Sequence, residues 1–143
     1  MKIYGIIITG HGNFAGGLQE TIELVLGHFN NIKYVNFKEG NSLDIFKEKL
    51  KSAIEELSFE NIICLTDIQG GTPYSTAVIL NSELEKNIKV LSGCNFPMIV
   101  SALDECDSDK SIDLIIEDII QLGREGIDIF KVKKKSEIEF DGI

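Results

Sequence analysis

The chain has 143 residues, of which 43% are hydrophobic and 26% charged, a composition typical of a globular protein with one core. Its net charge of −9 argues against general nucleic-acid binding, because phosphate contacts need clustered Lys and Arg. No apolar stretch approaches the ~20 residues that cross a bilayer, and the N-terminus lacks the layout of a secretory signal. Three cysteines without metal-ligand spacing suit a reducing compartment, so we expect a cytoplasmic protein.

The first half of the chain alternates strand patterns with amphipathic helical ones. The predicted order is strand 2–9, helix 18–26, strand 32–37, helix 43–57 and strand 61–67. The first and third strands are apolar almost to their ends, as in parallel strands buried on both faces. Ser42 is placed to cap the second helix, and Thr72 before Pro73 is placed to cap a third.

The second half continues the same alternation. Residues 87–92 predict a fourth strand, a short helix ends near residue 103, and a longer helix includes residues 112–122. Gly126 is placed to end that helix, and residues 127–132 have the alternation of a last strand. The fold class is therefore α/β, with a doubly wound, mostly parallel sheet and helices on both faces. We expect one domain, 1–143, in which 131–143 are a partly solvated tail.

A histidine between two glycines, His11, follows the first predicted strand. Ligands of open α/β sheets bind beyond the carboxyl ends of the strands, so His11, Asp67 and Asn95 should meet at one edge. A carboxylate that accepts the Nδ1–H of an imidazole leaves Nε2 free to act as a nucleophile. We therefore predict that His11 and Asp67 are catalytic residues of phosphoryl transfer through histidine. The structural alternatives are a histidine that only fills a turn and an aspartate that only caps one.

The turn after the third strand, Gly70-Gly71-Thr72, predicts the phosphoryl-binding part of the site. Gly70 and Gly71 allow backbone N–H groups to turn toward an anion, and the Thr72 hydroxyl is a further donor. Thr72 also opens a helix, and the N-terminus of a helix favours negative charge.

A competing motif lies at residues 10–15, where Gly10, Gly12 and Ala15 formally satisfy the dinucleotide-binding pattern G-x-G-x-x-A. Three points weigh against it: the chain is short for a dinucleotide domain plus a substrate domain, an imidazole projects where a pyrophosphate should lie, and Asn36 stands where an acidic residue is expected. A nucleotide- or phosphometabolite-binding module that uses this turn remains the alternative. No histidine or cysteine cluster indicates a metal, and we expect no cofactor.

Four segments together resemble the enzyme IIA component of the mannose-type sugar phosphotransferase system (PTS), across nearly the whole chain. They are Gly10-His11-Gly12, Asp67 with Gly70-Gly71-Thr72-Pro73, Gly93-x-Asn95-x-Pro97-Met98 and Gly123-Arg124-Glu125-Gly126. The resemblance implies a cytoplasmic phosphotransferase whose histidine, His11 here, takes a phosphoryl group from the carrier protein HPr and passes it to a IIB component during sugar uptake. Asp67 falls on the aspartate that orients the histidine, and Thr72 on a residue near the phosphoryl group.

The resemblance also implies an assembly and leaves some questions open. It implies four parallel strands plus one antiparallel strand, exchanged between the subunits of a homodimer, and residues 127–132 would be that strand. We expect IIB to be a separate polypeptide and contact with the membrane components to be indirect.

The related dihydroxyacetone kinase phosphotransfer subunit, which lacks the Gly-Gly-Thr-Pro turn, is the second possible function, and a regulatory role without transfer to IIB is the third. The sequence does not identify the sugar. It also does not separate docking surface from core at Phe14, Ile68, Tyr74, Phe96 and Met98.

Overall fold

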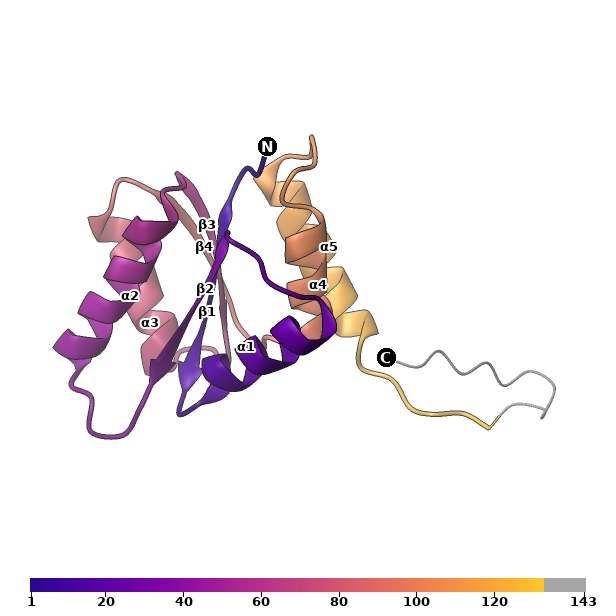
Figure 1. The fold of residues 1–143 in the computed structure, drawn as a ribbon, viewed down its shortest axis with the longest axis horizontal. Coiled ribbons are helices and arrows are strands. Elements are labelled where there is room, and N and C mark those ends of the chain that lie inside the picture. The colour runs from indigo at the N-terminus through magenta and orange to yellow at the C-terminus, as the bar shows by residue number, and fades with distance from the viewer. Residues whose placement is uncertain (133–143) are drawn as a thin grey trace.

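Within residues 1–132, which the computed structural model describes, four parallel strands form one sheet in the order β2-β1-β3-β4, surrounded by five helices (Figure 1). The elements are β1 (Gly5–His11), α1 (Phe14–Val25), β2 (Ile32–Phe37), α2 (Leu43–Leu57), β3 (Asn61–Thr66), α3 (Thr72–Glu83), β4 (Asn87–Leu91), α4 (Phe96–Asp104) and α5 (Ile112–Glu125). None of these helices has the length and apolarity needed to span a membrane.

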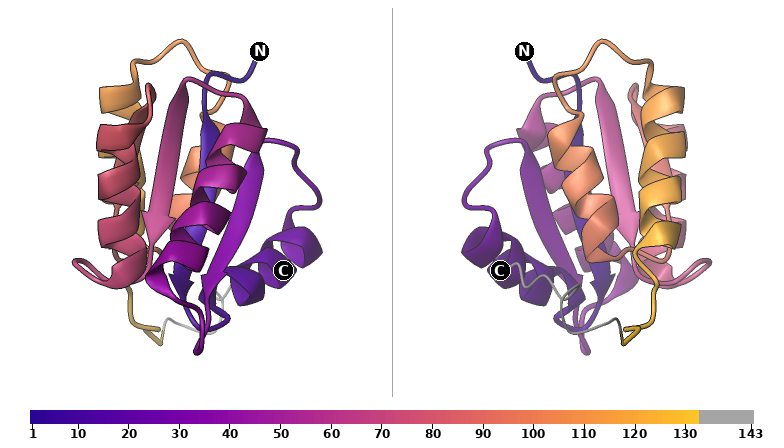
Figure 2. Two further views of the ribbon diagram at one scale, coloured as in Figure 1. Left: turned by 90° about the vertical axis from the view of Figure 1, so that its left-hand side faces the viewer. Right: turned by 90° about the vertical axis from the view of Figure 1, so that its right-hand side faces the viewer.

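Helices cover both faces of the sheet, as the apolar strands predict. α2 and α3 lie over one face, whereas α1, α4 and α5 lie over the other (Figures 1 and 2). Strand β1 shows the cause, because Ile6 and Ile8 belong to the core under α1, α4 and α5, while Ile7 belongs to the core under α2 and α3. All three side chains are fully buried. A strand that is apolar at every position needs a helical layer on each side.

The carboxyl ends of β1 and β3 lie at the point of the sheet where the strand order reverses. From β1 the chain passes to β2 on one side, and it then crosses to β3 and β4 on the other side. Two buried threonine hydroxyls hold these ends: Thr9 donates to Val35 O at 2.8 Å, and Thr66 donates to Leu91 O at 2.7 Å. The carboxyl ends of β1 and β3 are thus adjacent and fixed to their neighbours, at the position where doubly wound sheets bind ligands.

The expected fifth, antiparallel strand is not part of the sheet that one chain forms. Residues 127–132 have no strand assignment and extend away from the body of the domain, as the yellow segment of Figure 1 shows. Most of the expected tail, residues 133–143, lies outside the described residues.

A side chain from another strand caps the first helix. The N-cap residue of α1, Asn13, makes no side-chain cap hydrogen bond. Instead, Asn36 of β2 accepts the Gly16 N–H at 3.0 Å and donates to Asn13 Oδ1 at 2.9 Å. The helix start beside His11 is therefore tied to β2. By contrast, α2 begins as predicted, with Ser42 Oγ accepting the Ile45 N–H at 3.2 Å.

We predict that Asn36→Ala lowers the free energy of unfolding by about 1–2 kcal/mol, because it removes the cap of α1 and leaves Asn13 without its partner. Urea unfolding followed by circular dichroism measures the change. Asn41→Ala is the matched control, because within residues 1–132 no hydrogen bond of the Asn41 side chain is present, and it should change stability by less than about 0.5 kcal/mol. Equal effects of the two substitutions would show that the cap contributes nothing specific.

Candidate functional site

His11 is the last residue of β1, and its side chain is 41% exposed at the carboxyl edge of the sheet. Gly12 follows with φ +60°, a backbone conformation that favours glycine, and its N–H donates to Phe37 O at 2.8 Å. The chain therefore turns sharply directly after the histidine. The strand below remains buried, while the imidazole is presented to solvent.

Asp67 follows β3 and contacts His11 twice through one oxygen atom. Its Oδ2 accepts the His11 backbone N–H at 2.9 Å and lies 2.8 Å from Nδ1 of the ring. Its other oxygen, Oδ1, accepts the Ile68 N–H at 2.8 Å. An ionised carboxylate only accepts hydrogen bonds, so Nδ1 of neutral His11 carries the proton and Nε2 keeps a free electron pair. The structure thus brings the two predicted catalytic side chains together.

The same contacts determine the charge state of Asp67. Partial burial is the largest single influence and raises the pKa of its carboxyl. The hydrogen bonds from the His11 N–H, the His11 ring and the Ile68 N–H together outweigh burial and hold the pKa below its usual value. Because this pKa is lower in the folded chain than in the unfolded chain, the carboxylate stabilises the fold above about pH 4. That stabilisation is lost as the pH falls through the native pKa.

The N-terminus of α3 lies close to the Cε1 and Nε2 atoms of the His11 ring. A Cβ atom placed on Gly71 would be 2.8 Å from His11 Cε1 and 3.5 Å from Nε2. Thr72 was expected as the N-cap, but the cap is Gly71, and Thr72 is the first helical residue. Gly71 N–H donates to Ile68 O at 3.3 Å, so this N–H closes the turn. The first helical turn leaves further N–H groups without intrahelical acceptors, and Pro73 has none to offer. The helix end therefore faces Nε2 with positive electrostatic potential.

Two residues missing from the sequence prediction complete the surroundings of the ring. Phe37, the last residue of β2, meets the imidazole edge to face, with ring centroids 5.9 Å apart and an interplanar angle of 69°. The only feature of the sequence that could have predicted this contact is that Phe37 ends the strand next to β1. Asn36 is the second, since it holds the helix start after His11.

Asn95, expected at the same edge, has a different role. Its Oδ1 accepts the Met98 N–H at 3.2 Å as the cap of α4, and its Nδ2 donates to Gly123 O at 2.8 Å. Its side chain therefore joins α4 to α5. The loop before it still supports the site, because Gly93 N–H donates to Asp67 O at 3.1 Å.

The five apolar candidates for a docking rim now divide into groups. Ile68, beside Asp67, is 58% exposed, whereas Met98 is buried in the core. Phe14 and Phe96 are half-buried and pack against that core. Tyr74 lines a hollow beside β4 together with Met98. Ile68 is therefore the candidate most exposed beside the His11–Asp67 pair.

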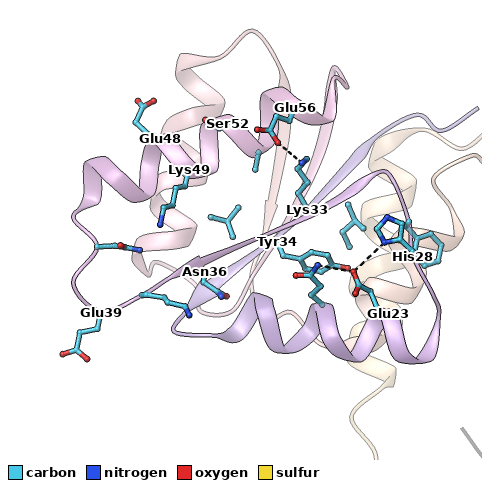
Figure 3. A pocket seen from close by; sticks show the side chains of 17 residues that line it. Glu23, His28, Lys33, Tyr34, Asn36, Glu39, Glu48, Lys49, Ser52 and Glu56 are labelled. Atoms are coloured by element: carbon cyan, nitrogen blue, oxygen red, sulfur yellow. Dashed lines mark hydrogen bonds and ion pairs between the residues drawn. The ribbon is translucent and has the colours of Figure 1, made fainter.

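A hollow of about 950 Å³ runs along the outer edge of β2, between α1 and α2, and His11 does not line it (Figure 3). Two pairs of its side chains are in contact: Lys33 Nζ lies 2.7 Å from Glu56 Oε2, and His28 Nδ1 lies 3.8 Å from Glu23 Oε1. Lysine on an edge strand discourages pairing with another chain. His28 is 83% exposed. Size alone therefore does not identify the reactive site.

The turn at residues 10–15 does not have the open backbone of a dinucleotide site. A Cβ on Gly10 would lie 2.5 Å from the Phe14 ring, so side chains already cover this glycine. The Gly12 N–H is bonded to a carbonyl of β2, and the Gly16 N–H is bonded to Asn36. These donors are not available to a pyrophosphate. In addition, no three His, Cys, Asp or Glu side chains among residues 1–132 are grouped to hold a metal ion.

The chain is similar to proteins of known family. The family model described as PTS system fructose IIA component matches residues 5–120. Over 131 residues the chain is 30% identical to the PTS system mannose-specific EIIAB component of Escherichia coli (strain K12), covering 90% of this chain and 40% of that protein. Over 99 residues it is 32% identical to the PTS system fructose-specific EIIA component of Bacillus subtilis (strain 168), covering 68% and 67%.

A solved structure agrees with these matches. The phosphotransferase system component EIIA from Streptococcus agalactiae superposes with a TM-score of 0.81 and 34% identity, covering 88% of this chain and 96% of that one. The present chain spans 40% of the length of the mannose-specific EIIAB relatives it matches. The shared fold includes the sheet and the helices that flank it.

We predict that the proton of neutral His11 resides on Nδ1, because Asp67 accepts it there. Long-range ¹H–¹⁵N correlation spectra, recorded at a pH where imidazole is neutral, distinguish the two tautomers. Asp67→Ala should convert His11 to a mixture of both. The exposed His28 is the internal reference and should be unchanged by the substitution. A wild-type His11 with its proton on Nε2 would contradict the orientation described here.

Proposed function

The chain belongs to the mannose-type family of PTS IIA components, and on that premise we propose that it is a phosphocarrier in which His11 takes a phosphoryl group from phospho-HPr and passes it to a IIB component during sugar uptake. The observation that carries the proposal is the 2.8 Å contact between His11 Nδ1 and Asp67 Oδ2. It leaves Nε2 free at an exposed edge, next to the start of a helix.

In the proposed reaction, Nε2 of His11 attacks the phosphorus atom in line with the donor nitrogen. A new N–P bond forms as the P–N bond of the donor breaks, and the electron pair of that bond returns to the donor ring. Positive charge develops on the His11 ring, and the Asp67 carboxylate stabilises it from Nδ1. The reverse sequence of bond changes delivers the group to the IIB acceptor. Catalysis rests on position and electrostatics, as is general for phosphoryl transfer.

The three oxygens of the phosphoryl group need donors on the Nε2 side of the ring. We assign this role to the start of α3, with the Gly70-Gly71-Thr72 turn as its backbone and the Thr72 hydroxyl as a side-chain donor. Backbone N–H groups and the dipole of a helix N-terminus favour a bound anion. The proximity of Gly71 to Nε2 supports the assignment.

The exposure of the site fits a carrier that acts on other proteins. His11 is 41% exposed, and the exposed Ile68 follows Asp67 directly. A donor imidazole on HPr or an acceptor on IIB must approach the same phosphorus atom, which requires a convex, accessible position. An apolar side chain beside polar reacting groups is suited to a transient protein contact.

We also propose that the chain is a homodimer in which residues 127–132 add an antiparallel strand to the partner's sheet. Four apolar side chains of this segment, Ile127, Ile129, Phe130 and Val132, are 73–87% exposed in one chain. The outer edge of β4 has no neighbouring strand among residues 1–132, and a hollow of about 380 Å³ lies beside it. A second copy of the segment would bury these side chains and pair the open edge.

We predict that incubation with phosphoenolpyruvate, enzyme I and HPr adds one acid-labile phosphoryl group to the chain. His11→Ala should abolish labelling, because it removes the nucleophile. Asp67→Ala should leave the protein folded and slow the transfer by about 10²-fold or more, as expected for loss of a group that orients a nucleophile and stabilises its developing charge. Intact mass spectrometry and rapid-quench labelling measure the two effects.

The matched control for this labelling is His28→Ala, which removes the other histidine of the chain and should leave it unchanged. If His28→Ala alone removes the label, the assignment to His11 is wrong. Wild-type kinetics in Asp67→Ala would rule out its orienting role. The labelled protein is then mixed with candidate IIB proteins. A transport carrier passes its phosphoryl group to one of them, whereas a regulatory protein keeps it.

We predict that Ile129→Asp shifts the protein from dimer to monomer in light scattering coupled to size-exclusion chromatography. The added charge would lie in the proposed exchanged strand, where burial without a partner is costly. Leu24→Asp is the control, because Leu24 is 84% exposed on α1 and far in sequence from this segment. A wild-type monomer, or equal behaviour of the two variants, would refute the exchanged strand.

A further inference from the structure

Two adjacent glycines, Gly70 and Gly71, precede α3. A different physical constraint favours glycine at each of the two positions. Gly70 has φ +76°, where an L side chain is strained, and nothing lies within 4 Å of the position of its missing Cβ. Gly71 has φ −70° and ψ 170°, an extended conformation that any residue adopts. Its missing Cβ, however, would lie 2.8 Å from His11 Cε1. Gly70 is therefore favoured by its backbone conformation, whereas Gly71 is favoured because a side chain there would clash with the imidazole.

The His11 ring has little freedom to avoid a side chain at position 71. Nδ1 lies 2.8 Å from Asp67 Oδ2, and the same oxygen holds the His11 backbone N–H at 2.9 Å. Phe37 packs its ring against the imidazole at an angle of 69°. A rotation that moves Cε1 away from residue 71 also moves Nδ1 relative to Asp67, because both atoms belong to one rigid ring. The clash is thus resolved at the expense of the Nδ1 contact.

The backbone on the other side of the contact is also held. Gly71 N–H donates to Ile68 O at 3.3 Å, and Gly71 O accepts the Ser75 N–H at 2.9 Å as the first hydrogen bond of the helix. The following Pro73 is buried, and α3 continues with the buried Ala77. Displacing this turn would disturb the packing of α3 against the sheet. Rotation of the exposed ring disturbs less, so a larger residue 71 should move His11.

We propose that Gly71 is a positioning residue: its lack of a side chain leaves room for the His11 ring beside the start of α3, with Nδ1 on Asp67 and Nε2 toward the helix N-terminus. This inference rests on the proposed function for its kinetic consequence, whereas its structural consequence is independent of any phosphoryl donor. The inference also gives Gly71 a role that Gly70 does not have, although the sequence pattern assigns both glycines to the same phosphoryl-binding turn.

The test is Gly71→Ala, which adds one methyl group without requiring a new backbone conformation. Spectra of the His11 nitrogens should lose the preference for the Nδ1–H tautomer. In transfer from phospho-HPr, kcat should fall by roughly 10²-fold with little change in KM, as expected when a reacting atom is displaced by about 1 Å. Thermal unfolding should stay close to that of wild type, because alanine is compatible with the backbone here.

Two control variants separate the contact from the general effect of replacing glycine. Gly17→Ala lies in α1 with nothing within 4 Å of its Cβ position, and it should change neither the tautomer nor kcat. Gly70→Ala should lower the thermal midpoint because of its positive φ, while His11 keeps the Nδ1–H tautomer.

The outcomes are distinct. A wild-type tautomer and wild-type kcat in Gly71→Ala would overturn the positioning role and leave the proposed function intact. A larger loss of thermal stability in Gly71→Ala than in Gly70→Ala would also overturn it, because the methyl group would then disturb the fold rather than the ring. If wild-type protein accepts no phosphoryl group on His11, the proposed function fails, and the tautomer spectra still decide whether Gly71 positions the imidazole.

Discussion

The contact between the Asp67 carboxylate and Nδ1 of His11 is the interaction on which the rest of the site depends. One carboxylate oxygen holds both the backbone N–H and the ring of the same histidine, so the position and the orientation of the imidazole are fixed together. The other oxygen is bound by the next residue in the chain. A carboxylate with three hydrogen bonds stays ionised, and the direction of the pKa shift of Asp67 agrees with this. The free nitrogen, Nε2, then lies near the start of α3.

Sheet topology brings these two side chains together from distant parts of the chain. His11 and Asp67 are 56 residues apart, and they meet because β1 and β3 are parallel neighbours whose carboxyl ends coincide. The buried hydroxyls of Thr9 and Thr66 fix these strand ends to the flanking strands. Parallel pairing, rather than any local motif, therefore sets the distance between the imidazole and its carboxylate.

Local sequence patterns predicted the parts of this structure that local physics controls. The apolar runs of β1 and β3, the Ser42 cap and the placement of His11 and Asp67 at the carboxyl ends of strands follow from periodicity and chain order. Asn36 was not predicted as the cap of α1, because its partner Gly16 is 20 residues away and no spacing signals the contact. The alternation of residues 127–132 predicted a fifth strand, but within residues 1–132 these residues have no strand assignment, because sequence alternation alone does not supply a neighbouring strand to pair with.

The site is an exposed edge rather than a deep pocket, and this suits the proposed role as a phosphocarrier. A small-molecule enzyme gains from enclosing its substrate, but the proposed donor and acceptor are side chains of folded proteins, which cannot enter a cavity. The reacting nitrogen must protrude, yet it must not rotate freely. The protein meets both needs by holding His11 from one side through Asp67, from below through the bare backbone of Gly71 and along its edge through Phe37. Rigidity therefore comes from these three contacts with the ring, while the His11 side chain as a whole remains 41% exposed.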